Sequence, residues 1–189
     1  MIIYVHGFRS SGESSKADVL SQNFSDTVVE RPDLPASPRE AIKLLQGLIE
    51  GQAESTMLVG SSLGGFYSLY LAAKYPLTAV LLNPSLAPWR TLAKSVGRHE
   101  RIHSDDTFLW TAEYNEALAE FGKEIDSASP FTNRLHFFLA EDDELLDHRS
   151  VPSLYAGAAT IEYFKDCTHR FIRFTEIVPK LKVIYGGLK

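Results

Sequence analysis

The sequence of 189 residues has a single cysteine, Cys167, so no disulfide can form within the chain. No apolar run approaches the roughly 18 residues that a membrane-spanning helix needs. The first residues enter an apolar stretch directly, without the basic segment and cleavage site of a secretory signal. These absences predict a soluble protein with no membrane partner, located in the reducing cytoplasm.

An excess of positive charge is also lacking. The formal net charge is −5, and the lysines and arginines are scattered along the chain rather than gathered in a stripe. Binding to a phosphate backbone requires such a basic surface, so nucleic acid is not expected as a partner. The hydrophobic fraction of 44% is enough for one substantial core. We therefore expect one domain over residues 1–189, and the oligomeric state stays open.

Short apolar runs alternate with helical patterns along most of the chain. The expected strands lie at residues 1–5, 27–30, 56–59, 78–82, 135–140 and 160–164. The expected helices lie at residues 14–24 and 37–49, from 62, from about 150, and from about 171 to 184. Repeated strand–helix units of this kind predict an α/β fold whose mostly parallel sheet carries helices on both faces.

Residues 83–130 interrupt this alternation. The segment is polar, contains Trp89 and Trp110, and is expected to form two helices near residues 91–96 and 111–125. We interpret it as a small helical, lid-like insertion over one edge of the sheet. Ligand pockets are mostly apolar, so the two tryptophans are candidates to line or cover a substrate pocket.

Residues 60–64 match the pattern G-x-S-x-G at the point where a strand ends and a helix begins. A sharp turn at this position lifts the central serine, Ser62, above the sheet, and the flanking glycines permit the strained backbone. The helix that follows offers backbone N–H groups to developing negative charge. Ser62 is therefore the candidate nucleophile.

A second loop, His6-Gly7-Phe8, follows the first expected strand. In a fold with a serine at such a turn, this loop donates one of the two N–H groups that stabilise the oxyanion. The backbone N–H groups of Phe8 and Leu63 are the candidates for that oxyanion hole, and the His6 side chain is a supporting residue of the pocket.

A serine hydroxyl needs a base, and the expected chain order in this fold is serine, acid, histidine. His169 lies in the loop after the last expected strand and is the candidate base. The loop after residues 135–140 holds several carboxylates, including Asp142, Glu144 and Asp147. Asp143 is preferred among them, because an Asp before a polar–apolar–apolar step is the usual form of this loop.

The motifs resemble the YqiA-type family of small bacterial esterases nearly from end to end. The matching segments are residues 2–8 with 10–11, 59–67, 83–84, 143–147 and 169–171. The resemblance implies an α/β-hydrolase fold and hydrolysis of acyl esters or thioesters without a cofactor. Matched motif to motif, it assigns Ser62, Asp143 and His169 as the catalytic residues.

Two other interpretations compete with a serine hydrolase. Residues 99–103 match H-E-x-x-H, the signature of zinc hydrolases in which His99 and His103 would bind the metal. Gly97 before this segment and the polar residues after it do not suit the long helix that such a site requires. The chain could also be a binding protein that shares the fold without catalysis, although an ordered set of serine, acid and histidine argues against this. We expect no metal.

Overall fold

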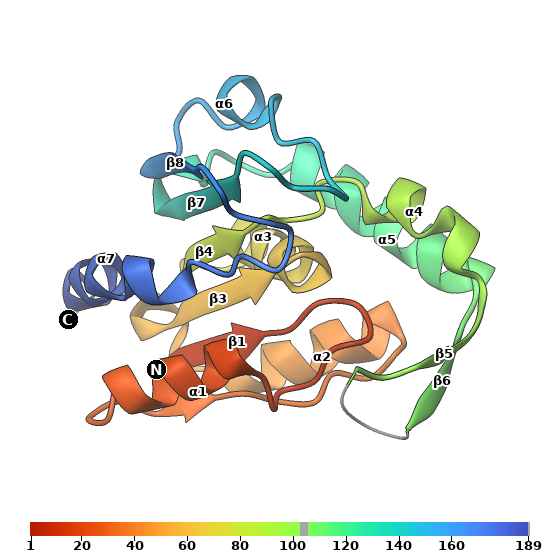
Figure 1. The fold of residues 1–189 in the computed structure, drawn as a ribbon, viewed down its shortest axis with the longest axis horizontal. Helices are drawn as coiled ribbons and strands as arrows, with labels where there is room; N and C mark the ends of the chain where they lie inside the picture. Colours follow the sequence, from red (N-terminus) through yellow and green to blue (C-terminus); the bar gives the residue numbers. More distant parts are fainter. Residues whose placement is uncertain (103–105, 189) are drawn as a thin grey trace.

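The structure, a computed structural model, describes residues 1–102 and 106–188. Its centre is a six-stranded sheet with the order β2-β1-β3-β4-β7-β8, and every neighbouring pair is parallel (Figure 1). The strands are β1 (Ile2–Val5), β2 (Val29–Glu30), β3 (Met57–Ser61), β4 (Thr78–Leu82), β7 (Leu135–Ala140) and β8 (Thr160–Phe164). The parallel sheet expected from the alternating pattern is therefore confirmed.

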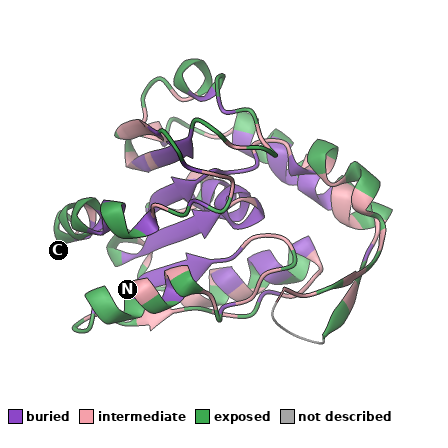
Figure 2. Ribbon diagram, in the orientation of Figure 1, coloured by how far each residue is buried: buried purple, intermediate pink, exposed green. Residues whose placement is uncertain are grey.

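Helices cover both faces of this sheet. The helices are α1 (Ser15–Asn23), α2 (Pro38–Ile49), α3 (Leu63–Lys74), α5 (Ala112–Asp126) and α7 (Phe174–Gly186). Alternate residues of β1 belong to two separate hydrophobic clusters. Ile3 belongs to the cluster with α2, α3 and α5, and Ile2 belongs to the cluster with α1 and α7. The sheet strands are buried and the outer sides of the helices are exposed (Figure 2). None of the helices described is long and apolar enough to cross a membrane.

Most element boundaries follow local signals in the sequence. Strands β4, β7 and β8 occupy the expected residues, and the Ser37 hydroxyl caps α2 by accepting a hydrogen bond from the Glu40 N–H at 3.4 Å. Two helices differ from expectation. Helix α6 (Val151–Leu154) is a single turn, and α7 starts at Phe174 because Phe171 has a φ of 50°, which no helix accepts.

Of the two helices expected in segment 83–130, the one near residues 111–125 is confirmed, whereas residues 91–96 hold only the end of a one-turn helix and a 3-10 turn. The segment begins with one turn, α4 (Pro88–Thr91), continues as an antiparallel hairpin of β5 (Gly97–Glu100) and β6 (Thr107–Trp110), and ends with α5. Helix α5 packs onto α3 through buried residues such as Leu118, so it belongs to the layer that covers the sheet. The hairpin escaped prediction because each of its strands has only four residues, and β5 is polar, with side chains that alternate between half-buried and exposed.

Close approach of backbone segments requires glycine at the turn between β3 and α3. A Cβ on Gly64 would lie 2.0 Å from the Val5 carbonyl oxygen, and a Cβ on Gly60 would lie 2.4 Å from the Gly64 carbonyl oxygen. Both distances are far below van der Waals contact with backbone atoms that cannot rotate away. Helix α3 therefore crosses the end of β1 at a separation that only glycine allows.

Replacement of Gly64 by alanine is expected to lower the free energy of unfolding by about 3 kcal/mol or more, because backbone segments must separate to admit the methyl group. Gly47 is the matched control: it lies inside α2 with nothing within 4 Å of its Cβ position. Alanine there is expected to stabilise the protein by about 0.5–1 kcal/mol through helix propensity. Urea unfolding of both variants measures the difference, and equal stability of the two would contradict the close approach.

Candidate active site

The functional candidates all lie at the carboxyl ends of parallel strands. His6 follows β1, Ser62 follows β3, Asp143 follows β7 and His169 follows β8. Carboxyl ends of parallel strands meet at one edge of the sheet, which is where open α/β sheets bind their ligands. Side chains that are up to 163 positions apart in the sequence are thereby brought together.

Ser62 has a strained backbone. Its φ of 56° and ψ of −116° are unfavourable for a residue with a side chain. Neighbouring chain segments hold this conformation: the Ser62 N–H donates to Leu82 O at 3.0 Å, and Ser62 O accepts from the Ser85 N–H at 3.1 Å. The turn projects the hydroxyl away from the sheet, toward the loop after β8.

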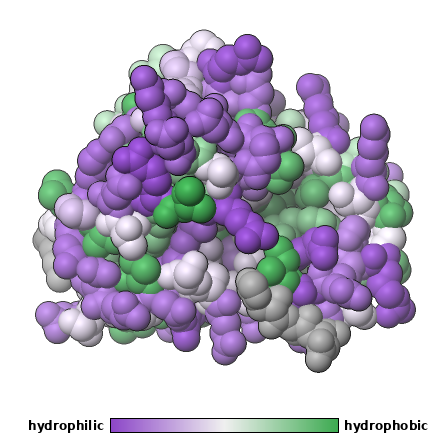
Figure 3. All heavy atoms as spheres, viewed as in Figure 1, coloured by the Kyte–Doolittle hydropathy of each residue, from purple (hydrophilic) through white to green (hydrophobic). Residues whose placement is uncertain are grey.

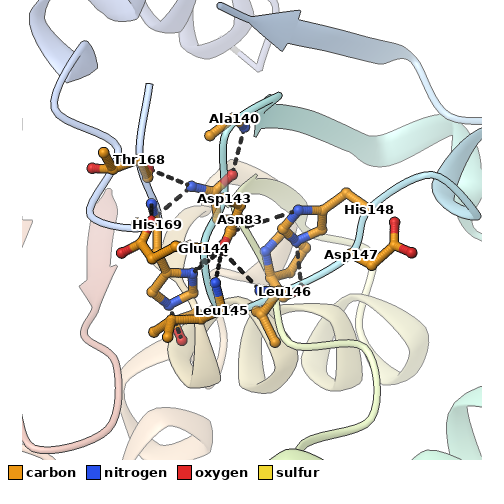
Figure 4. A network of polar contacts seen from close by, with 12 residues as sticks. Asn83, Ala140, Asp143, Glu144, Leu145, Leu146, Asp147, His148, Thr168 and His169 are labelled. Carbon is orange, nitrogen blue, oxygen red and sulfur yellow. Dashed lines mark hydrogen bonds and ion pairs between the residues drawn. The ribbon is translucent and has the colours of Figure 1, made fainter. Parts of the chain in front are cut away.

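A continuous hydrogen-bonded relay joins the three predicted residues. Ser62 Oγ lies 2.9 Å from His169 Nε2, and His169 Nδ1 lies 3.0 and 2.9 Å from the two carboxylate oxygens of Asp143. Donation from Nδ1 to the carboxylate leaves Nε2 with a free lone pair, which is the tautomer that can accept the proton of the serine hydroxyl. Figure 4 shows the acid end of this relay.

Asp143 is held as a carboxylate. Its side chain is 1% exposed, and its Oδ1 also accepts the backbone N–H groups of Leu145 and Leu146, each at 2.9 Å. Burial alone would raise the pKa of Asp143, but the hydrogen bonds from His169, Leu145 and Leu146 hold the pKa below its ordinary value. The charge that orients His169 is therefore present at neutral pH.

The other acidic residues of this loop have different partners. Asp142 accepts the Asp166 backbone N–H at 3.0 Å, and Glu144 accepts the His169 backbone N–H at 2.9 Å. Exposed Asp147 pairs with Arg149. Asp142 and Glu144 thus fasten the backbone of the loop that carries His169, while Asp143 alone of these acids contacts its ring.

Asn83, which the sequence analysis gave no role, links three strands. Its side-chain amide donates to the carbonyl oxygens of Thr168 and His169, each at 3.1 Å, and its Oδ1 accepts the Ala140 N–H at 2.7 Å (Figure 4). Asn83 is fully buried, with a φ of 43° that asparagine tolerates better than most residues. The side chain thus fastens the loop of the base to the strand that precedes the acid.

Replacement of Asn83 by alanine is expected to lower both the melting temperature and kcat, the latter by about tenfold or more. The change leaves the buried Ala140 N–H and two carbonyl oxygens without their partner, at a cost of about 1–3 kcal/mol for each orphaned group. The His169 loop then loses its connection to β4. Asn23→Ala is the control, since exposed Asn23 bonds only within its own helix. An Asn83→Ala variant with unchanged kcat and melting temperature would contradict this role.

The loop after β1 lies directly against Ser62. A Cβ on Gly7 would be 3.2 Å from the Ser62 Cβ, and the N–H of the next residue, Phe8, makes no hydrogen bond to another residue in the described part of the chain. The Leu63 N–H is the first of α3, where helix geometry provides no acceptor. Both N–H groups are thus free to bind an anion formed beside Ser62.

His6 fixes this loop. Its Nε2 accepts the Leu34 N–H at 3.0 Å, so Nδ1 carries the ring proton, and Nδ1 lies 2.9 Å from Gly7 O. Burial lowers the pKa of His6 and keeps the ring neutral. The side chain therefore connects the loop after β1 to the loop before α2, which is a positioning role.

An open cleft of about 1310 Å³ exposes Ser62 and His169 to solvent, with walls that include Phe8, Leu63 and Leu145. Hydrophobic residues gather in a hollow to the right of centre in the space-filling view, on the side of the molecule where α4, β5 and β6 lie (Figure 3). The cleft is large enough for a substrate with an apolar portion.

Neither tryptophan of the insertion is a lining residue of this cleft. Trp110 is 1% exposed and packs edge-on against Phe8, with the ring centroids 5.0 Å apart. Both residues line a cavity of about 30 Å³. Trp89 packs against Phe66, and a Cβ on Gly122 would lie 2.5 Å from its ring. Trp110 thus supports Phe8, and Trp89 fills the space between α3 and α5.

Residues 99–102, the described part of the H-E-x-x-H pattern, are not helical. His99 and Glu100 are residues of strand β5, so the pattern does not place two histidines on one helical face; His103 lies outside the described residues. Among the residues that are described, no group of three or more His, Cys, Asp or Glu side chains is arranged to hold a metal ion. Cys167 is fully buried.

Solved structures identify the fold. The chain is similar to the monoacylglycerol lipase of Paleococcus ferrophilus, with a TM-score of 0.74, 14% identity and coverage of 100% of this chain and 94% of that one. It is similar to the esterase domain of a Rhodothermus marinus protein, with a TM-score of 0.68, 18% identity and coverage of 96% and 84%. It is also similar to mouse alpha/beta hydrolase domain-containing protein 10, with a TM-score of 0.65, 15% identity and coverage of 100% and 90%. The protein has the α/β-hydrolase fold.

Sequence comparison then identifies the family. The chain belongs to UPF0227, described as an uncharacterised protein family, whose model matches residues 1–185. A UPF0227 protein of Shewanella sp. strain MR-4 is 24% identical over 99% of this chain and its own full length. The UPF0227 protein YcfP of Salmonella gallinarum strain 287/91 is 24% identical over 96% of this chain and 97% of its own. The resemblance to the YqiA-type family is confirmed at the level of the family.

Proposed function

We propose that this protein is a serine hydrolase that cleaves acyl esters or thioesters through an acyl-enzyme intermediate. The observation that carries the proposal is the relay from Ser62 Oγ through His169 to Asp143, with its buried, ionised acid and open access to the serine. The monoacylglycerol lipase and the esterase domain that share the fold agree with an ester substrate.

The geometry supports a two-stage reaction. Ser62 Oγ attacks the carbonyl carbon while its proton passes to His169 Nε2, and the N–H groups of Phe8 and Leu63 donate to the oxyanion. Collapse of this intermediate breaks the bond to the alcohol or thiol, which takes the proton from His169. His169 then deprotonates a water molecule, which attacks the acyl carbon of the acyl-enzyme. As this second tetrahedral intermediate collapses, the bond from the acyl carbon to Ser62 Oγ breaks, His169 returns the proton to Ser62 Oγ, and the acid is released. Each step uses only groups of the chain and water.

The apolar side of the cleft is proposed to hold the acyl chain. Phe8 and Leu63 contribute side chains to this side and backbone N–H groups to the oxyanion hole, so the acyl chain and the reacting carbonyl bind next to each other. Trp110 and Phe108 support Phe8 from the hairpin β5–β6. His6 positions the loop that carries Phe8.

Reaction with a fluorophosphonate probe tests the proposal. The wild-type protein is expected to form one covalent adduct at Ser62, located by mass spectrometry, and Ser62→Ala is expected to form none. A panel of p-nitrophenyl esters and matching thioesters of graded chain length then defines the substrate. An adduct at another serine would overturn the assignment, as would ester hydrolysis that a chelator abolishes and zinc restores.

A further inference from the structure

A second histidine, His148, contacts the acid of the relay. Asp143 lies between His169 and His148, and His148 Nδ1 is 3.6 Å from Asp143 Oδ2 (Figure 4). The side chains of His148 and Asp143 are 3% and 1% exposed. The contact is therefore shielded from solvent, where an electrostatic interaction is stronger than at the surface.

The hydrogen bonds of His148 define where its proton lies. Nε2 is 3.2 Å from the carbonyl oxygen of Pro84, which can only accept. Nδ1 is buried and has no hydrogen-bond partner in the described part of the chain, because 3.6 Å from Asp143 is too long. A neutral ring has one proton, and this geometry puts it on Nε2. The lone pair of Nδ1 then faces the Asp143 carboxylate.

Protonation would change this contact from repulsion to attraction. A neutral His148 can donate to one of its two neighbouring acceptors, Pro84 O or Asp143, whereas the imidazolium can donate to both. The charged and titratable groups that face the ring are Asp143 and Asp147, which favour its positive form, and His169, which opposes it. Tyr163 donates its hydroxyl to the His148 carbonyl at 2.8 Å and fixes the backbone.

We infer that His148 is a positioning residue for Asp143 and a second proton site of the catalytic relay. When His148 is neutral, the Asp143 carboxylate interacts with His169 alone. When His148 is protonated, the same carboxylate also forms an ion pair with His148. The inference rests on the proposed function, because it concerns the same relay.

Loss of activity at low pH then has two causes. Protonation of His169 removes the base, and protonation of His148 withdraws the charge that orients His169 and stabilises its imidazolium during attack. Burial, more than any other cause, lowers the pKa of His148, so the second proton is taken up on the acid side of the ordinary histidine value. The acid limb of log kcat/KM against pH is expected to have a slope that exceeds 1 and approaches 2.

Two amide substitutions imitate the two states of His148. Glutamine places an N–H near the position of Nε2 and cannot titrate, so the pH profile of His148→Gln, scaled to its own kcat/KM at pH 8, is expected to show an acid limb of slope 1. Asparagine places its N–H near the position of Nδ1, toward Asp143. His148→Asn is therefore expected to lower kcat at pH 8 by about tenfold.

His136→Gln is the matched control, because His136 is a half-buried histidine of β7 that bonds Thr160 Oγ1 at 3.0 Å and makes no contact with Asp143 in the described residues. It is expected to retain the wild-type slope. The pH profiles use an ester substrate between pH 4.5 and 8.5, and circular dichroism at each pH verifies that the protein is folded.

The position of the proton is measured directly by NMR of protein with ¹⁵N-labelled histidine. The expected result at pH 8 is the Nε2–H tautomer for His148 and the Nδ1–H tautomer for His169. An Nδ1–H tautomer at His148 overturns the inference even where the variants fail to fold. A slope of 1 in the wild type overturns the inference, and so do equal acid limbs in the wild type and a folded His148→Gln. In either case, hydrolysis that depends on Ser62 leaves the proposed function standing. Absence of Ser62-dependent hydrolysis at every pH overturns the proposed function instead.

Discussion

Replacement of Ser62 by alanine is expected to lower kcat for ester hydrolysis by at least about 10⁴-fold, because the acyl-enzyme can no longer form. In a serine protease whose triad acts as a unit, loss of the nucleophile alone costs about 10⁶ in kcat. The residual rate over water comes from the oxyanion N–H groups and substrate binding. Steady-state hydrolysis of the best ester of the panel measures the loss.

The fold should survive this substitution. Alanine keeps the Cβ and therefore the strained φ of 56°, and the backbone hydrogen bonds to Leu82 and Ser85 do not involve the hydroxyl. The melting temperature is expected to stay within a few degrees of the wild type. Ser61→Ala is the adjacent control: Ser61 also lines the cleft, and its variant is expected to keep kcat within about tenfold. A Ser62→Ala protein with substantial esterase activity would exclude the acyl-enzyme mechanism.

Asp143→Asn is expected to lower kcat by at least about 10²-fold, because an amide has nearly the shape of the carboxylate but none of its charge. The corresponding change in a serine protease costs about 10⁴, since the histidine adopts the wrong tautomer. Here the Asn amide would also face the Leu145 and Leu146 N–H groups, which require an acceptor. The one oxygen of the amide can accept hydrogen bonds from those two N–H groups or from the His169 N–H, but it cannot accept all three with good geometry.

Two neighbouring acids provide the comparison for Asp143. Asp147→Asn removes an exposed charge that pairs with Arg149, and exposed ion pairs contribute little. Asp142→Asn retains an oxygen that can accept the Asp166 N–H. Both variants are expected to keep kcat within about tenfold. If Asp147→Asn lost most of its kcat and Asp143→Asn kept nearly all of it, Asp147 would have to be assigned as the acid that orients His169.

Stability should depend on Asp143 in the acid range. Its folded pKa is depressed, so its contribution to the free energy of unfolding is present above the ordinary pKa of about 3.8 and is lost as the pH falls through the lower, folded value. His6 and His148 have folded pKa values below the ordinary 6.5, so they take up protons on unfolding and also weaken the fold as the pH falls. All three effects have the same sign and favour stability near neutral pH.

The sequence by itself determined the parallel sheet and the place of the serine. Buried parallel strands are short apolar runs with clear ends, so local composition located β4, β7 and β8 to the residue. The glycines at positions 60 and 64 marked the strained turn because no other residue allows such close backbone contact. Chain order and loop position then selected His169 from the six histidines.

Only the tertiary structure decided how the loops at the edge of the sheet share their hydrogen bonds. The acids at positions 142, 143, 144 and 147 look alike in the sequence, and their partners are a backbone N–H, the ring of His169, another backbone N–H and an arginine. Asn83 contacts these loops from a strand that is distant in the sequence, and His148 lies against the carbonyl oxygen of Pro84, 64 residues away. Hydrogen bonds depend on direction and on distances of tenths of an ångström. Such geometry arises only when residues remote in the chain are packed together, whereas the preference for strand or helix is already present in a few neighbouring side chains.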